Sequence, residues 1–374
     1  MAKVKCPYCG GGAKKFGKTG AGSQRWRCLE CAATFTRKID NAAKLLASFL
    51  SWLMSGKRQR DMKGGGRTFR RKCARFWSVW PLAPKTGEVH RVVFVDGIYL
   101  ARNVVVLIAS TEKHVIGWYM ARSENSRAWA SLMAPIPPPE VVVTDGGPGF
   151  EKARKRVWPE TKVQRCVFHA FCQVKKQTTT RPNLQAGAEL YGLAKDLLRV
   201  ETADAATAWL LAYNDWCARW DRFLSEKTLD AETGRWEWTH ARLVTARNGL
   251  NTLIRRGVLF TFLDPELATE GPLPRMNNRL EGGVNAQLRD MLRKHRGLSK
   301  LRRAKAVYWW CYMHSECPLP AAEILRTMPT DDDIAELYQT LAFEPQKRDG
   351  PKEWGDGLVW SELHHSTPWR IDWD

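Results

Sequence analysis

The sequence lacks any long apolar run. Its most apolar stretch, Val104–Ala109, has the length of a β-strand, whereas a membrane-spanning helix needs about 18 apolar residues. No apolar segment follows the charged start at Met1–Cys6, which excludes a secretory signal peptide. We therefore expect a cytoplasmic protein without a membrane partner. In that reducing compartment, paired cysteines favour a metal site over a disulfide.

Acidic residues are scarce at the beginning of the chain. Residues 1–90 contain 20 Lys or Arg but only 4 Asp or Glu, a net charge of +16, whereas residues 91–374 carry only +4 of the total of +20. A charge needed only for solubility would not concentrate in this way. The distribution predicts a polyanionic partner, most simply nucleic acid, although a solvated basic face is the alternative.

Two Cys-x2-Cys pairs lie in this basic part, Cys6/Cys9 and Cys28/Cys31, with 18 residues between them. Four thiolates held by two tight turns complete a tetrahedral Zn²⁺ site, and a unit with so small an apolar core needs the metal to fold. A redox Cys-x2-Cys is the alternative, but the surrounding βαβ pattern is lacking. The sequence therefore predicts a zinc ribbon with one structural Zn²⁺.

Helical patterns follow the ribbon. Ala42–Met54 has apolar residues at helical spacing, Lys57–Met62 is long enough for a short helix, and Arg67–Val79 forms a third helix after the turn at glycines 64–66. This order is the outline of a helix-turn-helix DNA-binding domain. A plain helical linker is the alternative.

From residue 91 the pattern changes to buried strands that alternate with helices. Three close strands are expected over Arg91–Asp96, Val104–Ala109 and Val115–Tyr119, as an antiparallel meander. The later elements are a helix over Ser126–Met133, a strand over 141–145, a helix over Phe150–Val157 and a strand over Lys162–Cys166. The order βββαβαβ predicts an α/β, ribonuclease-H-like mixed sheet.

Two of these strands end in a carboxylate, Asp96 and Asp145. The first and fourth strands are neighbours in this fold, so both side chains should meet at the carboxyl ends of the strands, where α/β sheets bind ligands. Two carboxylates forced together repel each other unless a divalent cation lies between them. The pair therefore predicts Mg²⁺ or Mn²⁺, and a third carboxylate would complete a site for two ions.

Glu281 is the candidate for the third carboxylate. Asn277 or Asn278 can cap a long helix that begins near Arg279. A glutamate in the first turn of a helix is also a routine partner of the helix dipole, and composition by itself favours that structural interpretation.

At this point the residues resemble a known family. Four segments carry the resemblance: Val95–Gly97, Val143–Gly146, Gln164–His169 and Asn277–Gly282. They are similar to motifs of bacterial insertion-sequence transposases of the Mutator-like type, a branch of the DDE transposases, and the likeness extends over nearly the whole chain. The resemblance implies that Asp96, Asp145 and Glu281 form the catalytic, metal-binding triad, with two Mg²⁺ (or Mn²⁺) per active site.

The resemblance also implies an all-α insertion between the second and third acids. Helical spacing over Leu184–Leu198, Ala203–Phe223 and Arg242–Arg255 supports it independently. Several tryptophans enrich this part, and we expect most of them in the core and one or two at the surface. Cys166 and His169 are expected to support the active site by packing and hydrogen bonding; as zinc ligands they would lack a second pair.

The implied activity is binding of terminal inverted repeats, hydrolysis of a phosphodiester bond at the element end, and transesterification into target DNA. No P-loop sequence is present, and neither step needs ATP. The resemblance further implies a homodimer on double-stranded DNA in the bacterial cytoplasm, associated with the nucleoid. A ribonuclease-H-like nuclease without strand transfer, or a catalytically silent DNA-binding regulator derived from a transposase, are the alternatives.

Basic side chains in three regions are the expected DNA contacts. They are Arg25, Arg27, Lys57, Arg58, Arg67, Arg70, Arg71, Arg289, Arg293 and Arg296. The expected organisation is a zinc ribbon over 1–36, a helix-turn-helix domain over 37–88, the first part of the catalytic core over 89–172, the all-α insertion over 173–275, the catalytic helix with Glu281 over 276–318, and an acidic, Trp-containing tail over 319–374.

Overall fold

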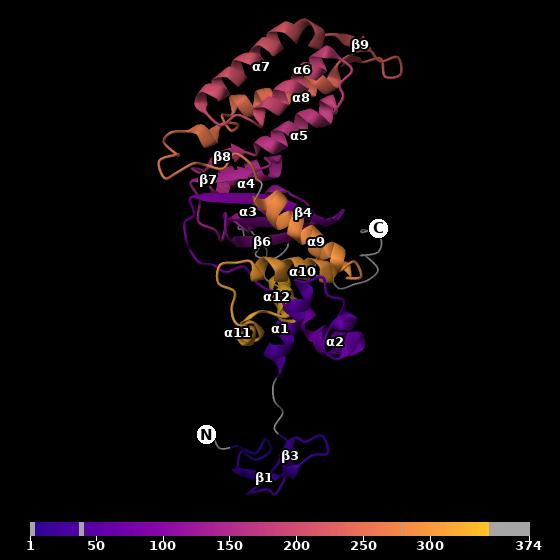
Figure 1. Cartoon of the computed structure of the whole chain (residues 1–374), viewed down its shortest axis with the longest axis vertical. Helices are drawn as coiled ribbons and strands as arrows, with labels where there is room; N and C mark the ends of the chain where they lie inside the picture. The colour runs from indigo at the N-terminus through magenta and orange to yellow at the C-terminus, as the bar shows by residue number, and fades with distance from the viewer. Residues whose placement is uncertain (1–3, 37–40, 278, 344–374) are drawn as a thin grey trace.

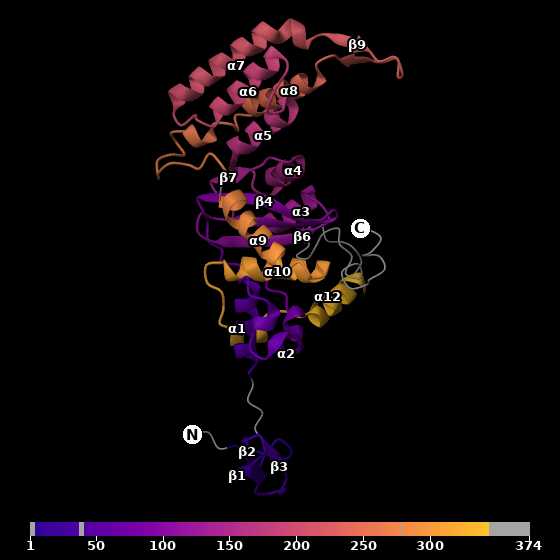
Figure 2. The same cartoon turned by 45° about the vertical axis from the view of Figure 1, so that its right-hand side comes forward.

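A computed structural model of the chain describes residues 4–36, 41–277 and 279–343, and excludes the side chains of 279–281 and 340–343. Figures 1 and 2 show an elongated arrangement, with three short strands at one end, a mixed sheet in the middle and a group of helices at the other end. Within the described ranges, none of the helices is both long and apolar enough to cross a membrane.

The N-terminal unit is a three-stranded antiparallel sheet. Its strands are β1 (Ala13–Lys18), β2 (Gln24–Cys28) and β3 (Thr34–Thr36), in that spatial order. Of its described apolar side chains, only those of Cys6 and Cys28 are buried. The hydrophobic contribution of this unit to its own stability is therefore small.

The central unit is a five-stranded mixed sheet. Its strands are β4 (Val92–Ala101), β5 (Val104–Ser110), β6 (Val115–Ala121), β7 (Val141–Thr144) and β8 (Lys162–Arg165), in the order β6-β5-β4-β7-β8. The first three pair antiparallel, as the predicted meander requires, and β7 and β8 are parallel to β4. The prediction that the first and fourth strands are neighbours is confirmed, and Val95 is in register with Thr144.

Helices cover both faces of this sheet. The helices on one face are α3 (Ser126–Met133) and α4 (Pro148–Val157). Trp129 and Phe150 from these helices share a buried cluster with Val93 and Val95 of β4. The first helix begins and ends as predicted, and the second begins two residues early because Pro148 suits the first turn of a helix.

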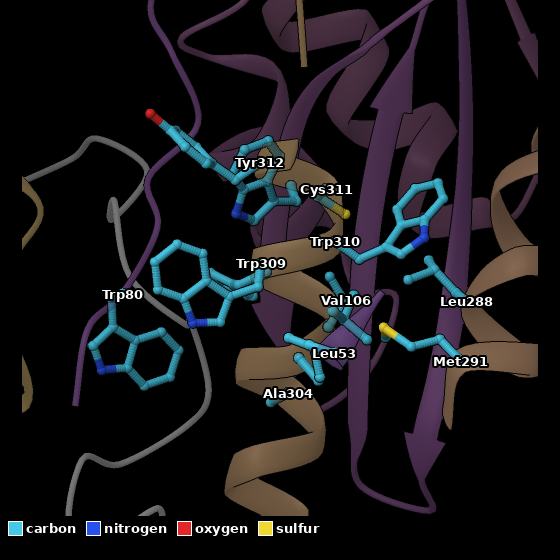
Figure 3. Close-up of a cluster of buried hydrophobic side chains, with 14 of the residues drawn as sticks. Leu53, Trp80, Val106, Leu288, Met291, Ala304, Trp309, Trp310, Cys311 and Tyr312 are labelled. Carbon is cyan, nitrogen blue, oxygen red and sulfur yellow. The ribbon is translucent and has the colours of Figure 1, made fainter. Parts of the chain in front are cut away.

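The other face of the sheet is covered from both ends of the chain. The helices α9 (Ala286–Lys294) and α10 (Lys300–Met313) lie against this face, and α1 (Ala42–Leu53) packs beyond α10 in the same buried cluster (Figure 1). Figure 3 shows Trp309 and Trp310 of α10 among Leu53 of α1, Val106 of β5 and Met291 of α9. The predicted N-terminal helical module is therefore packed directly onto the core of the central unit.

The rest of this helical module differs from the expected three helices. It contains η1 (Gln59–Asp61), α2 (Gly65–Cys73) and η2 (Ala74–Trp77). The expected single helix over Arg67–Val79 is wrong, because the α-helix ends at Cys73 and a 3-10 turn follows. The tighter turn directs Phe76 into the core, where it is fully buried, and two of the three glycines expected as a turn belong to α2.

An all-α insertion with a small hairpin follows β8. Its elements are α5 (Val167–Thr178), α6 (Gln185–Leu197), α7 (Ala203–Leu224), β9 (Lys227–Leu229), β10 (Trp236–Trp238), α8 (Ala241–Arg255) and η3 (Thr261–Leu263). Trp209 and Trp216 are buried in its own core, whereas Trp236 and Trp238 on the hairpin are exposed. Trp220 is partly buried. The expectation that most of these five tryptophans lie in the core is therefore wrong, whereas the expectation of one or two at the surface is confirmed by the hairpin pair.

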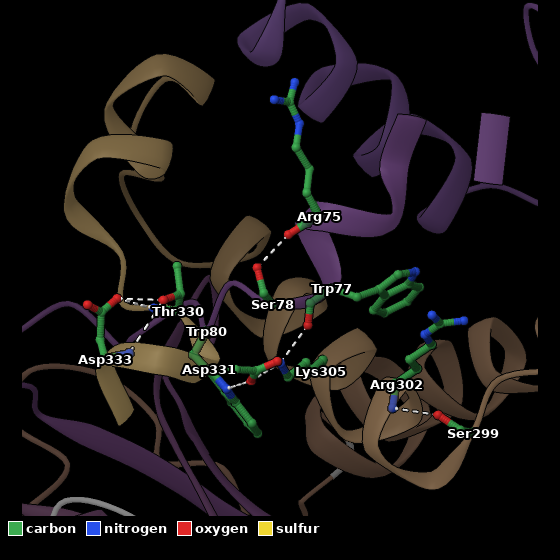
Figure 4. A network of polar contacts seen from close by, with 10 residues as sticks. All are labelled: Arg75, Trp77, Ser78, Trp80, Ser299, Arg302, Lys305, Thr330, Asp331 and Asp333. Atoms are coloured by element: carbon green, nitrogen blue, oxygen red, sulfur yellow. Dashed lines mark hydrogen bonds and ion pairs between the residues drawn. The ribbon is translucent and has the colours of Figure 1, made fainter. Parts of the chain in front are cut away.

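The beginning of the expected acidic tail is folded. It forms α11 (Ala321–Thr327) and α12 (Asp331–Phe343), and residues 344–374, with the remaining tryptophans, lie outside the described ranges. Figure 4 shows how α12 is attached: Asp331 contacts the buried ammonium of Lys305 and accepts a hydrogen bond of 2.7 Å from Trp80 Nε1. Lys305 also donates to the carbonyl oxygen of Trp77.

Candidate active site and metal centre

Asp96 and Asp145 lie on adjacent parallel strands of the central sheet. Asp96 follows Val95 in β4, and Asp145 follows Thr144 at the end of β7. Val95 and Thr144 are paired across these two strands. Both aspartates are half-buried. The valine-rich strands before them are buried on both faces, which holds the backbone at this edge of the sheet rigidly.

A π-helix, η4 (Arg279–Asn285), contacts β4 beside Asp96. The Asn277 amide donates to the carbonyl oxygen of Val95 at 3.2 Å, and the Asn285 amide donates to Asp96 Oδ2 at 2.7 Å. The backbone of Glu281 lies between these two attachments, and its side chain is outside the described part. A helix does begin at Arg279, as expected, but its first seven residues form the wider π-helix, and α9 begins only at Ala286.

Glu124, in the loop between β6 and α3, is a carboxylate that the sequence did not indicate. Its Oε1 lies 2.5 Å from the position that a Cβ on Gly97 would occupy, and its carbonyl oxygen lies 2.2 Å from the corresponding position on Gly149. Burial, and next the negative charge of Asp145, raise the pKa of Glu124 to about 7. Gly97 and Gly149 in the sequence indicate only that space is left beside each aspartate. The neighbouring residues in the sequence do not show which side chain fills that space.

Arg165, at the end of β8, is another group that the sequence analysis missed. Its side chain is only 5% exposed, and Nη1 lies 2.3 Å from where a Cβ on Gly146 would be. Burial lowers the pKa of this guanidinium, while the charge of Asp145 opposes that shift. Among the described residues, Asp145 Oδ1 and Arg165 Nε and Nη1 are shielded from solvent and have no hydrogen-bond partner.

Cys166 is buried between the sheet and the segment that leads into η4. Its Sγ accepts a hydrogen bond of 3.2 Å from the backbone N–H of Asn277, and its own N–H donates to the carbonyl oxygen of Thr144. His169 follows one turn later on α5 and is half-buried. The thiol thus connects the strand with Asp145 to the segment with Glu281.

The four cysteines of the ribbon come together as a compact donor set. Their sulfur atoms lie within 4.8 Å of one another, with 3.7 Å between Cys6 and Cys31 and 3.4 Å between Cys9 and Cys28. Tetrahedral Zn–S bonds of about 2.3 Å place sulfurs about 3.8 Å apart, so the group could hold a structural zinc ion. The backbone N–H of Cys31, together with that of Glu30, lowers the pKa of Cys28 to about 6, which favours the thiolate.

The acidic side chains are less tightly grouped. Within the described part of the chain, the ribbon cysteines are the one group of three or more potential ligands that meets the distance criterion for a metal site. Asp96 and Asp145 nevertheless follow paired residues on adjacent parallel strands, and carboxylate oxygens are the ligands that divalent cations such as Mg²⁺ prefer.

The basic residues expected to contact DNA are all exposed. Arg25 and Arg27 project from one side of β2, and α2 presents Arg67, Arg70 and Arg71. The imidazole of His295, just after α9, is buried against α1 and hydrogen-bonds the carbonyl oxygen of Leu53 at 2.9 Å. This contact brings the basic stretch 289–296 next to the loop with Lys57 and Arg58.

Comparisons with known proteins bear on the same region. Residues 87–240, which include Asp96 and Asp145, match the family described as "Transposase, Mutator family". Similar curated proteins are a probable transposase for an insertion sequence element from Corynebacterium diphtheriae (26% identity over 161 residues, 38% of this chain and 45% of that protein) and the transposase for insertion sequence element IS905 from Lactococcus lactis subsp. lactis (26% over 147 residues, 35% and 36%). A third is the transposase for insertion sequence element IS6120 from Mycolicibacterium smegmatis (27% over 158 residues, 37% and 47%).

The matched part of the chain spans less than half the length of each of these relatives. The matched family is one of transposases, and all three relatives are named as transposases for insertion sequence elements. Residues 87–240 are similar to the Mutator family of transposases, which confirms the resemblance that the motifs indicated.

Proposed function

We propose that the chain is a DDE transposase that binds the terminal inverted repeats of an insertion sequence and catalyses metal-dependent DNA cleavage and strand transfer. The single observation that carries this proposal is the juxtaposition of Asp96 and Asp145 on adjacent parallel strands within the matched domain. The sheet order β6-β5-β4-β7-β8 supports a ribonuclease-H-like fold for this domain, because it allows two distant acids to meet at one sheet edge.

Glu281 is proposed as the third acid because of where its backbone lies. It is four residues before Asn285, which is about one turn of a π-helix, and Asn285 bonds Asp96 directly. The three acids would hold two Mg²⁺ or Mn²⁺ ions. The chemistry that such ions supply when bound is activation of an attacking oxygen and stabilisation of the leaving 3′ oxygen.

The described residues suggest how the protein prepares this chemistry. Asn285 orients the Asp96 carboxylate, and the Gly97 N–H donates to its other oxygen, Oδ1, at 2.8 Å. Cys166, just before α5, and His169 on α5 would support the edge of the site. Cys166 contacts β7 through its backbone N–H and the segment before η4 through its thiol. Water would serve as nucleophile in cleavage and a DNA 3′-OH in strand transfer, so neither step needs a covalent protein intermediate.

The exposed basic residues of the ribbon, of α2 and of the 289–296 stretch are proposed to bind phosphates of the element ends and of target DNA. The ribbon is proposed to contain one structural Zn²⁺. A homodimer would pair two element ends, as the family resemblance implies, and the protein would act on the bacterial nucleoid.

The test compares purified wild type with Asp96→Ala on a labelled duplex that carries the element end, in Mg²⁺ or Mn²⁺. We expect the variant to bind the duplex like wild type but to lose cleavage and joining by roughly three orders of magnitude or more. Asp332→Asn, on the exposed start of α12, is the matched control and should keep both activities. Retained cleavage by Asp96→Ala would contradict the triad.

The same assay separates the two alternatives. Wild-type protein that cuts without joining would be a nuclease. Wild-type protein that binds the repeats without cutting, with a binding curve unchanged by Asp96→Ala, would be a regulator.

A further inference from the structure

Glu124 lies where the two aspartate-bearing segments approach each other. Gly97 directly follows Asp96, and its missing side chain leaves the space that the Glu124 carboxylate occupies. Gly149, in the first turn of α4 after Asp145, leaves space for the Glu124 backbone in the same way. An alanine at either position would collide with this residue, at 2.5 and 2.2 Å respectively. The backbone near each of the two aspartates therefore leaves space for Glu124.

The Glu124 carboxylate is not engaged in holding the fold. Among the described residues, its oxygens have no hydrogen-bond or ion-pair partner, although the side chain is half-buried. The next residue, Asn125, caps α3 by accepting hydrogen bonds from the N–H groups of Arg127 and Ala128, so the start of that helix does not need Glu124. A half-buried carboxylate that has no partner and lies beside a second carboxylate raises the free energy of the folded state.

Two neighbouring groups indicate that a ligand completes this region. Asp145 Oδ1 is shielded and unpartnered, and the Arg165 guanidinium, itself only 5% exposed, presents two unpartnered N–H groups against Gly146. Buried polar atoms without partners are rare in folded proteins, and each needs an explanation such as an absent ion. A divalent cation would complete the Asp145 and Glu124 oxygens, which are acceptors. The Arg165 N–H groups are donors that a cation cannot satisfy, and their charge offsets part of the negative charge of Asp145.

We propose that Glu124 is a fourth carboxylate of the divalent-cation site, on the Asp145 side. This inference rests on the proposed function, because it extends the cation site of the same active centre. Glu124 would supply one oxygen ligand to the ion next to Asp145, directly or through a bound water. Gly97 and Gly149 are then small because a larger residue would displace this ligand.

The test measures metal binding without DNA. Zinc-loaded, full-length protein is titrated with Mn²⁺ at pH 8, and free Mn²⁺ is counted by its electron paramagnetic resonance signal. We expect Glu124→Gln to weaken Mn²⁺ binding about tenfold or more. Glu112→Gln, an identical change on the exposed turn between β5 and β6, is the matched control and should bind Mn²⁺ like wild type.

A second readout distinguishes a ligand from a structural residue. Glu124→Gln removes a charge that Asp145 repels, so the Tm of the metal-free protein should rise or stay the same while the increase in Tm caused by Mn²⁺ becomes smaller. A lower metal-free Tm would mean that Glu124 supports the fold, and would overturn the proposal.

The remaining outcomes separate this inference from the proposed function. If Glu124→Gln binds Mn²⁺ like wild type while Asp145→Asn loses binding, Glu124 is not a ligand but the cation site stands. If Asp96→Asn and Asp145→Asn both bind Mn²⁺ like wild type, the cation site itself is wrong, and the proposed function fails with it.

Discussion

The two candidate metal centres of this chain are built in opposite ways. The ribbon gathers four sulfurs from two tight turns within Cys6–Cys31, whereas the acidic site combines Asp96, Asp145 and, as proposed, Glu281 from three distant segments. The first has almost no apolar core of its own, and the second is held by a sheet buried on both faces. Metal is thus expected to fold the ribbon, while the fold creates the acidic site before any metal binds.

The substitution Cys28→Ser tests whether metal folds the ribbon, and it should have the largest effect. Zinc content should fall from about one equivalent to none, and the ribbon should unfold, because structural Zn²⁺ contributes on the order of 10 kcal/mol to such a unit. The melting transition of the central sheet should not change. Zinc analysis with calorimetry measures both. Cys317→Ser, at an exposed free thiol, is the control, and a ribbon that keeps its zinc without Cys28 would refute this prediction.

The reverse experiment is Trp309→Ala. This side chain is fully buried between α1 and the sheet, and its truncation should lower the free energy of unfolding of the central unit by about 3–5 kcal/mol. Zinc should remain at about one equivalent. Denaturant unfolding of the central unit and zinc analysis of the same sample measure the two effects, and a loss of zinc would mean that the two regions fold together.

The ion pair between Lys305 and Asp331 provides a further test of how the central unit is stabilised without metal. Asp331→Asn leaves the buried ammonium without its charged partner and should cost about 3 kcal/mol. Lys305→Met should cost less, because the remaining Asp331 carboxylate is 26% exposed and keeps its hydrogen bond from Trp80. Denaturant unfolding of each variant provides the measurement. Equal losses for the two variants would contradict this account.

The same pair predicts a pH dependence. Burial lowers the pKa of Lys305 from 10.5 to about 8. Between these pH values the unfolded chain binds more protons than the folded one, so the free energy of unfolding should gain a contribution as pH rises from 8 to 10.5. Lys305→Met should lack this gain in unfolding curves recorded across that range.

The smallest expected effect on stability is that of Asn285→Ala. It removes the hydrogen bond to Asp96 Oδ2 and should cost about 1 kcal/mol. Cleavage should nevertheless fall about tenfold, because the carboxylate loses its orientation. Gln287→Ala, an exposed amide two residues later, is the control. Wild-type cleavage by Asn285→Ala would mean that other contacts fix Asp96.

Features that depend on local sequence could be predicted. The spacing of the cysteines indicated the ribbon, and the order of valine-rich strands indicated that β4 and β7 are neighbours, because both follow from short patterns. The break at Cys73 could not be predicted, since apolar residues continue at helical spacing and only the contacts of Phe76 show why the turn tightens. The π-helix at Glu281 is similar, because its width comes from its attachments to β4.

The acidic site shows the limit of a single sequence most clearly. Asp96 and Asp145 were found because each follows a run of buried apolar residues. The expected strand end at Asp96 is wrong, since β4 continues to Ala101. Glu124 occupies an irregular loop whose sequence carries no strand or helix signal. Its importance comes from proximity to Gly97 and Gly149, which are distant in sequence. Arg165 was hidden for a related reason, since a charged residue at a strand end normally faces water.

The insertion leaves and rejoins the core at one stem. Val167 N–H donates to the carbonyl oxygen of Arg275 at 3.1 Å, one residue after Cys166 and two before Asn277, and Cys166 and Asn277 are themselves bonded. Because this stem is adjacent to the strand end of Asp145, a tilt of the whole helical insertion would pivot there. A displacement of the insertion about this stem would therefore act first on the strand end that precedes Asp145.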